Sequence, residues 1–125
     1  MKRFIFSFKA ASSGIAYVIR NEANFRIHLV FVVLVISGGL FFSISSLNWI
    51  MLFLSMAFVL SAEIFNTAIE VLCNKVQPAQ DPLIRIIKDV AAGAVLLSAI
   101  AAIVIGLIIF LPYCIMLIKL FFLFL

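Results

Sequence analysis

The stretch Ala62–Leu72, AEIFNTAIEVL, ends a long hydrophobic run and yet carries two carboxylates and an amide. In a helix, the offsets of three and seven residues would place Glu63, Asn66 and Glu70 on one face. The apolar run before them predicts that this helix crosses a membrane. A carboxylate within the hydrocarbon region costs on the order of 2.5–3.5 kcal/mol, so it requires a partner or a function. The stretch therefore predicts both a membrane fold and a site.

The composition of the whole chain indicates an all-α integral membrane protein. Of its 125 residues, 67% are hydrophobic and 11% are charged, whereas a soluble domain is about half apolar and a quarter charged. At about 20 residues per helical span, the chain can hold about three transmembrane helices and no separate soluble domain. The net charge of +4 does not indicate a nucleic-acid partner, because the basic residues cluster at the predicted membrane edges.

Hydrophobic periodicity divides the single membrane domain, residues 1–125, into four helices and a tail. Residues 1–20 have apolar side chains at helical spacing and basic residues on other faces, which predicts an amphipathic helix on the membrane surface. The predicted transmembrane spans are about 29–46, 50–72 and 86–111. Pro112 is expected to kink or end the third span. The hydrophobic tail, 112–125, either extends that helix or lies in the interface.

Several single residues carry predictions about packing. Gly38 and Gly39 in the first span, and Gly93 in the third, predict close approach between helices. Trp49 is expected to anchor the turn between the first two spans at the membrane interface. Cys73 and Cys114 fall at opposite ends of a predicted span, so a disulfide within one chain is not expected.

The basic residues also predict the orientation. Five lysines and arginines precede the first span and three more flank the loop at 74–85, whereas the turn between the first two spans has none. By the positive-inside rule, the amino terminus and the 74–85 loop are cytoplasmic and the carboxyl terminus is outside. All acidic residues then lie on the cytoplasmic side: Glu22, Glu63, Glu70, Asp81 and Asp89.

This acidic cluster has the parts needed for phosphoryl transfer. Carboxylates near the membrane surface can hold Mg²⁺, which prefers oxygen ligands and often accompanies phosphates. The deeper Glu63 could take a proton from a hydroxyl group, and a nearby lysine could neutralise phosphate oxygens. Together these parts predict transfer from a soluble nucleotide to an alcohol dissolved in the bilayer. The sequence contains neither a P-loop nor a G-x-G-x-x-G turn, so any nucleotide site is of another kind.

Two other classes of function use the same residues differently. A small proton-coupled transporter could use Glu63 as its membrane carboxylate, although transporters usually place that charge near the midplane, in a pathway open to both sides. A non-catalytic membrane scaffold would not need Glu63, Asn66 and Glu70. His28, at the start of a span, is expected to be an interfacial hydrogen-bonding residue.

Three segments resemble one known family. NEANFRIH at 21–28, AEIFNTAIE at 62–70 and IIKDVAAGAVLL at 86–97 resemble the prokaryotic diacylglycerol kinases, a family that includes the undecaprenol kinases. The E-x-x-N-[ST]-A-I-E pattern at 63–70 is highly specific to that family, and the resemblance covers roughly residues 3–111. It implies an ATP- and Mg²⁺-dependent lipid kinase of the bacterial inner membrane. It also implies a homotrimer of three-span subunits, each with a surface helix, whose active sites are shared between subunits.

The resemblance also implies roles for individual residues. Glu63 matches the proposed general base that deprotonates the lipid hydroxyl, and Glu22 and Glu70 match the glutamates that bind Mg²⁺ and the ATP phosphates. The other matched residues are expected at the nucleotide: Asn66 organising the site, Lys88 near the γ-phosphate, Asp89 beside it, and Arg3 and Asp81 more loosely. Apart from the resemblance, Arg26 either contacts the lipid head or the product phosphate, or serves only as one of the basic residues that set the topology.

The chain departs from the family pattern at two places near the site. Asn74 stands four residues after Glu70, where the family commonly has Asp, and Asp81-Pro82 stands where many relatives have His-Pro. Loss of the charge at Asn74 is expected to weaken contacts to the nucleotide or the loop. The expected substrate is a membrane lipid with a primary alcohol, and the segments favour undecaprenol slightly over diacylglycerol.

Overall fold

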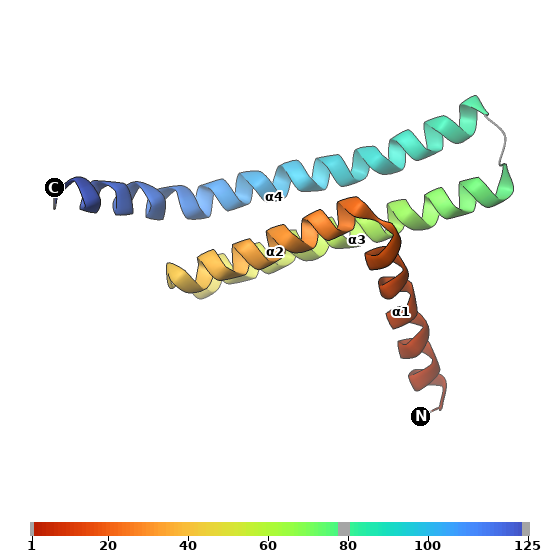
Figure 1. Ribbon diagram of the computed structural model, residues 1–125, viewed down its shortest axis with the longest axis horizontal. Helices are drawn as coiled ribbons and strands as arrows, with labels where there is room; N and C mark the ends of the chain where they lie inside the picture. The colour runs from red at the N-terminus through yellow and green to blue at the C-terminus, as the bar shows by residue number, and fades with distance from the viewer. Residues whose placement is uncertain (1, 78–80, 124–125) are drawn as a thin grey trace.

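The computed structural model describes residues 2–77 and 81–123, nearly all of which are helical. The helices are α1 (Lys2–Asn21), α2 (Ala23–Phe41), α3 (Ser46–Val76) and α4 (Pro82–Leu123). Figure 1 shows α3 and α4 running alongside each other in opposite directions, with α2 over α3 and α1 projecting away from the bundle. The predicted all-α architecture is therefore confirmed for the described residues.

Three of these helices, α2, α3 and α4, are long and apolar enough to cross a membrane. At about 1.5 Å per residue they measure roughly 29, 47 and 63 Å, against a hydrocarbon core of about 30 Å. Most of their large apolar side chains are exposed, as expected for surfaces that meet lipid or other subunits rather than water. The predicted number of helices able to cross a membrane is therefore confirmed for the described residues.

Two connections lie elsewhere than the sequence predicted. α2 begins at Ala23 and ends at Phe41, so the segment NFRIH, expected to lead into the first span, is itself helical, and the helix ends before the expected end of that span. The turn before α3 is also shorter than expected. Ser45 caps α3 by accepting a hydrogen bond from the Asn48 backbone N–H at 3.3 Å, so the helix starts at Ser46 and includes Trp49.

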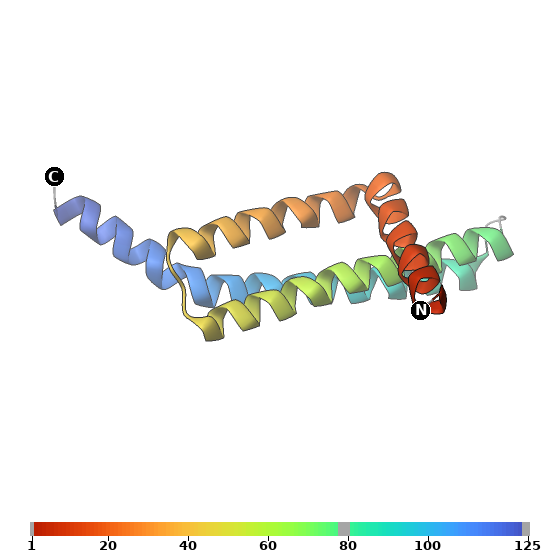
Figure 2. The ribbon, with the colours of Figure 1, turned by 90° about the horizontal axis from the view of Figure 1, so that it is seen from below.

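The tail after Pro112 extends the last helix. α4 runs from Pro82 to Leu123 with Pro112 inside it, so Pro112 does not end the span. Figure 2 shows the last turns of α4 leaving the direction of the rest of the helix. A proline within a helix removes one backbone hydrogen bond and commonly produces such a bend.

The main apolar core lies at the end of the bundle where α2 turns into α3. Its buried residues are Ile44, Leu52 and Ile109. Gly39 packs against Trp49, and a Cβ added to this glycine would come within 2.6 Å of the indole ring. A Cβ added to Gly38 would lie 3.3 Å from the Phe110 ring. The predicted close approach at these two glycines is confirmed. Trp49 thus packs over α2, and its position relative to a membrane stays a prediction.

Gly93 does not make the predicted contact within the chain. A Cβ added there would meet nothing within 4 Å, because that side of α4 faces away from α2 and α3. The expectation for the cysteines holds: Cys73 and Cys114 are both free.

Candidate active site

The polar face of α3 carries Glu63, Asn66 and Glu70. The end of this face at Glu63 is turned toward the other helices. Glu63 is only 3% exposed, and Asn66 and Glu70 are half-buried. The Asn66 side chain donates to Glu70 Oε1 at 3.2 Å, which links neighbouring turns of the helix. The Glu63 carboxylate accepts no hydrogen bond from the described residues, so both of its oxygens remain available to a ligand.

Glu22 joins this face from the junction of α1 and α2. It is the single non-helical residue between them, with φ −105° and ψ 115°, and its side chain makes no capping hydrogen bond. Its charge acts on Glu63, as does that of Glu70. The structure therefore brings together three of the residues expected at the site, from two separate parts of the chain.

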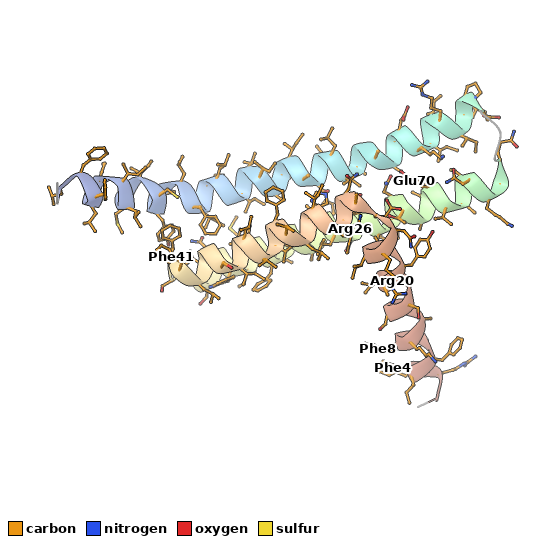
Figure 3. All side chains as sticks on the ribbon, viewed as in Figure 1. Phe4, Phe8, Arg20, Arg26, Phe41 and Glu70 are labelled. Carbon is orange, nitrogen blue, oxygen red and sulfur yellow. The ribbon has the colours of Figure 1, made fainter. Side chains whose placement is uncertain are left out.

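Arg26 fixes the α1–α2 junction. Its guanidinium donates from Nη1 to the carbonyl oxygens of Ile19 at 3.1 Å and Arg20 at 3.0 Å, which are among the carbonyls left unpaired at the end of α1. Figure 3 shows Arg26 and Glu70 in the part of the molecule where α1 meets the other helices. Arg26 thus holds the backbone that carries Glu22, a contact that the sequence did not predict.

His28 belongs to the same cluster, which the sequence analysis missed. It is half-buried on α2, near enough to Glu63 for the two side chains to interact. The available signal was its spacing: His28 follows Phe25, the most buried residue of the helix start, by three positions, which places both on the inward face.

Lys88, on α4, is held by the amide of Asn74, which lies one helical turn beyond Glu70 on α3. Its Nζ donates to Asn74 Oδ1 at 2.6 Å, which connects the end of α3 to the start of α4. Asp89 instead faces Arg85, at 3.8 Å between exposed side chains. Lys88 and Asp89 are adjacent in sequence, but they point to different partners.

Two other expected residues are engaged locally or lie apart. The Asp81 carboxylate accepts from the backbone N–H groups of Leu83 at 2.8 Å and Ile84 at 3.3 Å, so it caps α4. Arg3 is exposed near the start of α1, the helix that projects away from the bundle (Figure 1). Within one chain, the structure does not bring Arg3 to Glu63.

Comparison with known proteins identifies the family. The sequence matches the family described as prokaryotic diacylglycerol kinase over residues 9–110. The chain belongs to this family. It is 38% identical to the undecaprenol kinase of Bacillus subtilis over 112 residues, which is 90% of this chain and 91% of the relative. It is 37% identical to a diacylglycerol kinase of Synechocystis sp. over 107 residues, 85% of this chain and 61% of that longer relative. The chain is therefore a lipid kinase by family.

A kinase of this family uses ATP, and the side chains around Glu70 include oxygen atoms of the kind that bind Mg²⁺. In residues 2–77 and 81–123, no group of three or more His, Cys, Asp or Glu side chains is placed to hold a metal ion. Magnesium usually binds through one or two carboxylates plus phosphates and water rather than in a cage made of protein groups. Asn66 Oδ1 is buried and has no hydrogen-bond partner in the described part of the chain. This oxygen, beside the Glu70 carboxylate, suits a cation that arrives with a nucleotide.

Proposed function

We propose that this chain transfers the γ-phosphate of ATP to the primary hydroxyl of a membrane lipid alcohol. The observation that carries the proposal is the placement of Glu63. This carboxylate is buried in an apolar helix, accepts no hydrogen bond from the described residues, and lies close to Glu22 and Glu70. Membership of the lipid kinase family supports the same reaction.

Glu63 acts in this proposal as the general base. A lipid hydroxyl within hydrogen-bond distance of its carboxylate gives up its proton as the lipid oxygen attacks the γ-phosphorus. The new P–O bond forms as the bond to the β-phosphate oxygen breaks, and ADP leaves with that electron pair. Because the surroundings of Glu63 exclude water, they also limit transfer of the phosphoryl group to water instead of lipid.

Glu22 and Glu70 are the proposed ligands of Mg²⁺, with Asn66 Oδ1 beside them. Bound there, the ion would neutralise phosphate charge and align the ATP for transfer. Asn66 keeps the Glu70 carboxylate in place through its 3.2 Å hydrogen bond. Lys88 would bind the γ-phosphate, and its sequence neighbour Asp89 is assigned to the nucleotide. Asp81, at the start of α4, is assigned to the nucleotide side.

The site becomes complete when copies of the chain assemble, and we propose a homotrimer. Arg3 is exposed near the free end of α1, where a contact with ATP held by a neighbouring subunit would account for its place in the family pattern. Large apolar side chains cover the outer faces of α2, α3 and α4, and other subunits as well as lipid can cover them.

The proposed location is the bacterial inner membrane, with the site at the cytoplasmic face. Both basic clusters, at α1 and around the start of α4, lie at one end of the molecule (Figure 1). The positive-inside rule assigns that end to the cytoplasm. Phe4 and Phe8 are 76% and 69% exposed on α1, which suits a helix that lies in the membrane surface. Arg26 has further N–H groups that can meet a lipid head or product phosphate.

Undecaprenol is the preferred substrate in this proposal and diacylglycerol the second. The undecaprenol kinase relative matches this chain over almost the full length of both proteins, whereas the diacylglycerol kinase relative is considerably longer. Both alcohols present a primary hydroxyl at the membrane surface, so Glu63 could serve either of them.

A phosphate-transfer assay tests the substrate and the metal together. Purified protein in mixed micelles is given labelled ATP with undecaprenol or diacylglycerol, in Mg²⁺ or in excess chelator. We expect labelled lipid in Mg²⁺ only, with the faster rate on undecaprenol. A faster rate on diacylglycerol would reverse the substrate order. A rate in excess chelator equal to the rate in Mg²⁺ would contradict the proposed metal-binding roles of Glu22 and Glu70.

A further inference from the structure

The hydrogen bond between Lys88 and Asn74 joins two helices at the edge of the site. The Lys88 Nζ atom lies 2.6 Å from Asn74 Oδ1, and Lys88 is half-buried while Asn74 is exposed. Lys88 forms no ion pair with a carboxylate among residues 2–77 and 81–123, where the one ion pair joins Arg85 to Asp89. A neutral amide is thus the group that holds this ammonium.

We infer that Asn74 is a positioning residue, which holds Lys88 at the site without neutralising its charge. Asn74 lies four residues after Glu70, so both side chains are on the same face of α3. The hydrogen bond therefore keeps the Lys88 ammonium on the face of α3 that carries Glu70, at the carboxyl-terminal end of that helix. An ammonium group has three N–H donors, and Asn74 takes one, leaving two for the oxygens of an anionic group.

The neutrality of the acceptor matters for the affinity of the site. An aspartate at 74 could hold Lys88 equally well, but its charge would offset the attraction of Lys88 for a phosphate. Asn74 supplies the acceptor oxygen and leaves the positive charge in full. The sequence departure at this position, which was expected to weaken the site, is then a way of keeping Lys88 attractive to the nucleotide. This inference rests on the proposed lipid kinase function.

Steady-state kinetics with MgATP in mixed micelles test the inference on full-length protein. The first variant is Asn74→Leu, which keeps the approximate size of the side chain and removes the acceptor. Gln77→Leu is its matched control, because Gln77 is an exposed amide three residues further along and no hydrogen bond joins its side chain to Lys88 in the described structure. We expect Asn74→Leu to raise the KM for MgATP about three- to tenfold, the size of one exposed polar contact. The KM for lipid and that of Gln77→Leu should not change.

A second background shows whether Asn74 acts through Lys88. In Lys88→Met, the further change Asn74→Leu should leave the KM for MgATP unaltered, since the group it positions is gone. An additional rise of the same size in this background would overturn the positioning role. Provided that wild-type protein is active in the same assay, equal KM values for Asn74→Leu and Gln77→Leu would also overturn the positioning role.

Asn74→Asp tests the neutrality of the acceptor. We expect a higher KM for MgATP at low salt, and a smaller difference from wild type as salt screens the new charge. A KM equal to that of wild type at low salt would overturn the claim that a neutral acceptor matters. Wild-type protein that is folded but transfers no phosphate to either lipid would contradict the proposed function itself, and this result is distinct from all of the variant outcomes.

Discussion

The two ends of the bundle bury different kinds of side chain. Where α2 turns into α3, buried apolar groups and two glycines bring the helices into contact. Where α1 meets α2, the buried and half-buried groups include Glu63, Asn66 and Glu70. Burial of a carboxylate opposes stability unless it is compensated. Apolar packing at the α2–α3 turn can offset this cost and keep the polar end folded. Substitutions at the two ends should therefore separate loss of stability from loss of activity.

Apart from the Glu63 variant of the closing test, the largest effect is expected at the polar end, from Glu70→Gln. Glutamine keeps the size of the side chain and an oxygen that can accept from Asn66, so the helix should remain folded. Removing one charge from the proposed Mg²⁺ site should lower the rate of lipid phosphorylation on the order of 100-fold. Measured rates across a Mg²⁺ titration would show this loss. A wild-type rate at ordinary Mg²⁺ concentrations would exclude Glu70 as a metal ligand.

The next effect is expected at the apolar end, from Gly39→Ala. The added methyl group would lie 2.6 Å from the Trp49 ring, so α2 and α3 must separate or the indole must move. Overpacking of this kind costs about 1–3 kcal/mol. Thermal unfolding in micelles should show a lower midpoint, while protein that is still folded keeps its KM for MgATP. A normal midpoint would argue against the tight packing of this end.

These two ends also differ in how well the sequence predicted them. Hydropathy was sufficient for three spans, and small residues at 38 and 39 correctly indicated close packing. The sequence did not indicate that α2 begins as early as Ala23, because Asn24, Arg26 and His28 are polar and hydropathy does not register a helix that continues past the membrane edge. The cap at Ser45 was available in the sequence as a serine three residues before Asn48.

The site was less predictable, because most of its contacts join separate helices. Spacing within one helix placed Glu63, Asn66 and Glu70 together, and the structure agrees. Nothing in the sequence indicated that Lys88 would reach Asn74, or that His28 would approach Glu63. Such contacts depend on how helices cross, which side-chain spacing along one helix does not determine.

A smaller effect is expected at the α1–α2 junction of the polar end, from Arg26→Gln. The change removes hydrogen bonds to the carbonyls of Ile19 and Arg20, which are worth about 1–2 kcal/mol in all if partly replaced by water. Faster hydrogen exchange in residues 17–22 should report the loosened junction. Arg20→Gln is the control, since the Arg20 side chain makes no hydrogen bond in the described structure. Equal exchange in both variants would contradict the role of Arg26.

The smallest effect is expected from Gly93→Ala, on the outer side of α4. An added methyl group there meets nothing within 4 Å, so the stability of one chain should change by less than about 0.5 kcal/mol. Alanine also favours a helix over glycine. Unfolding and cross-linking of the assembled protein would check this result. A large loss of stability together with loss of oligomer would place Gly93 at a contact between subunits.

The central claim is that the buried Glu63 is the base for transfer of phosphate to a lipid alcohol. Its most direct test is the initial rate of label transfer from MgATP to undecaprenol, for wild type and Glu63→Gln at equal amounts of folded protein. We predict a rate lower by about 10²–10⁴-fold for Glu63→Gln, with MgATP binding largely retained. Comparable rates for the two proteins would show that Glu63 is not the base, and the absence of labelled lipid with folded wild type would favour the transporter hypothesis.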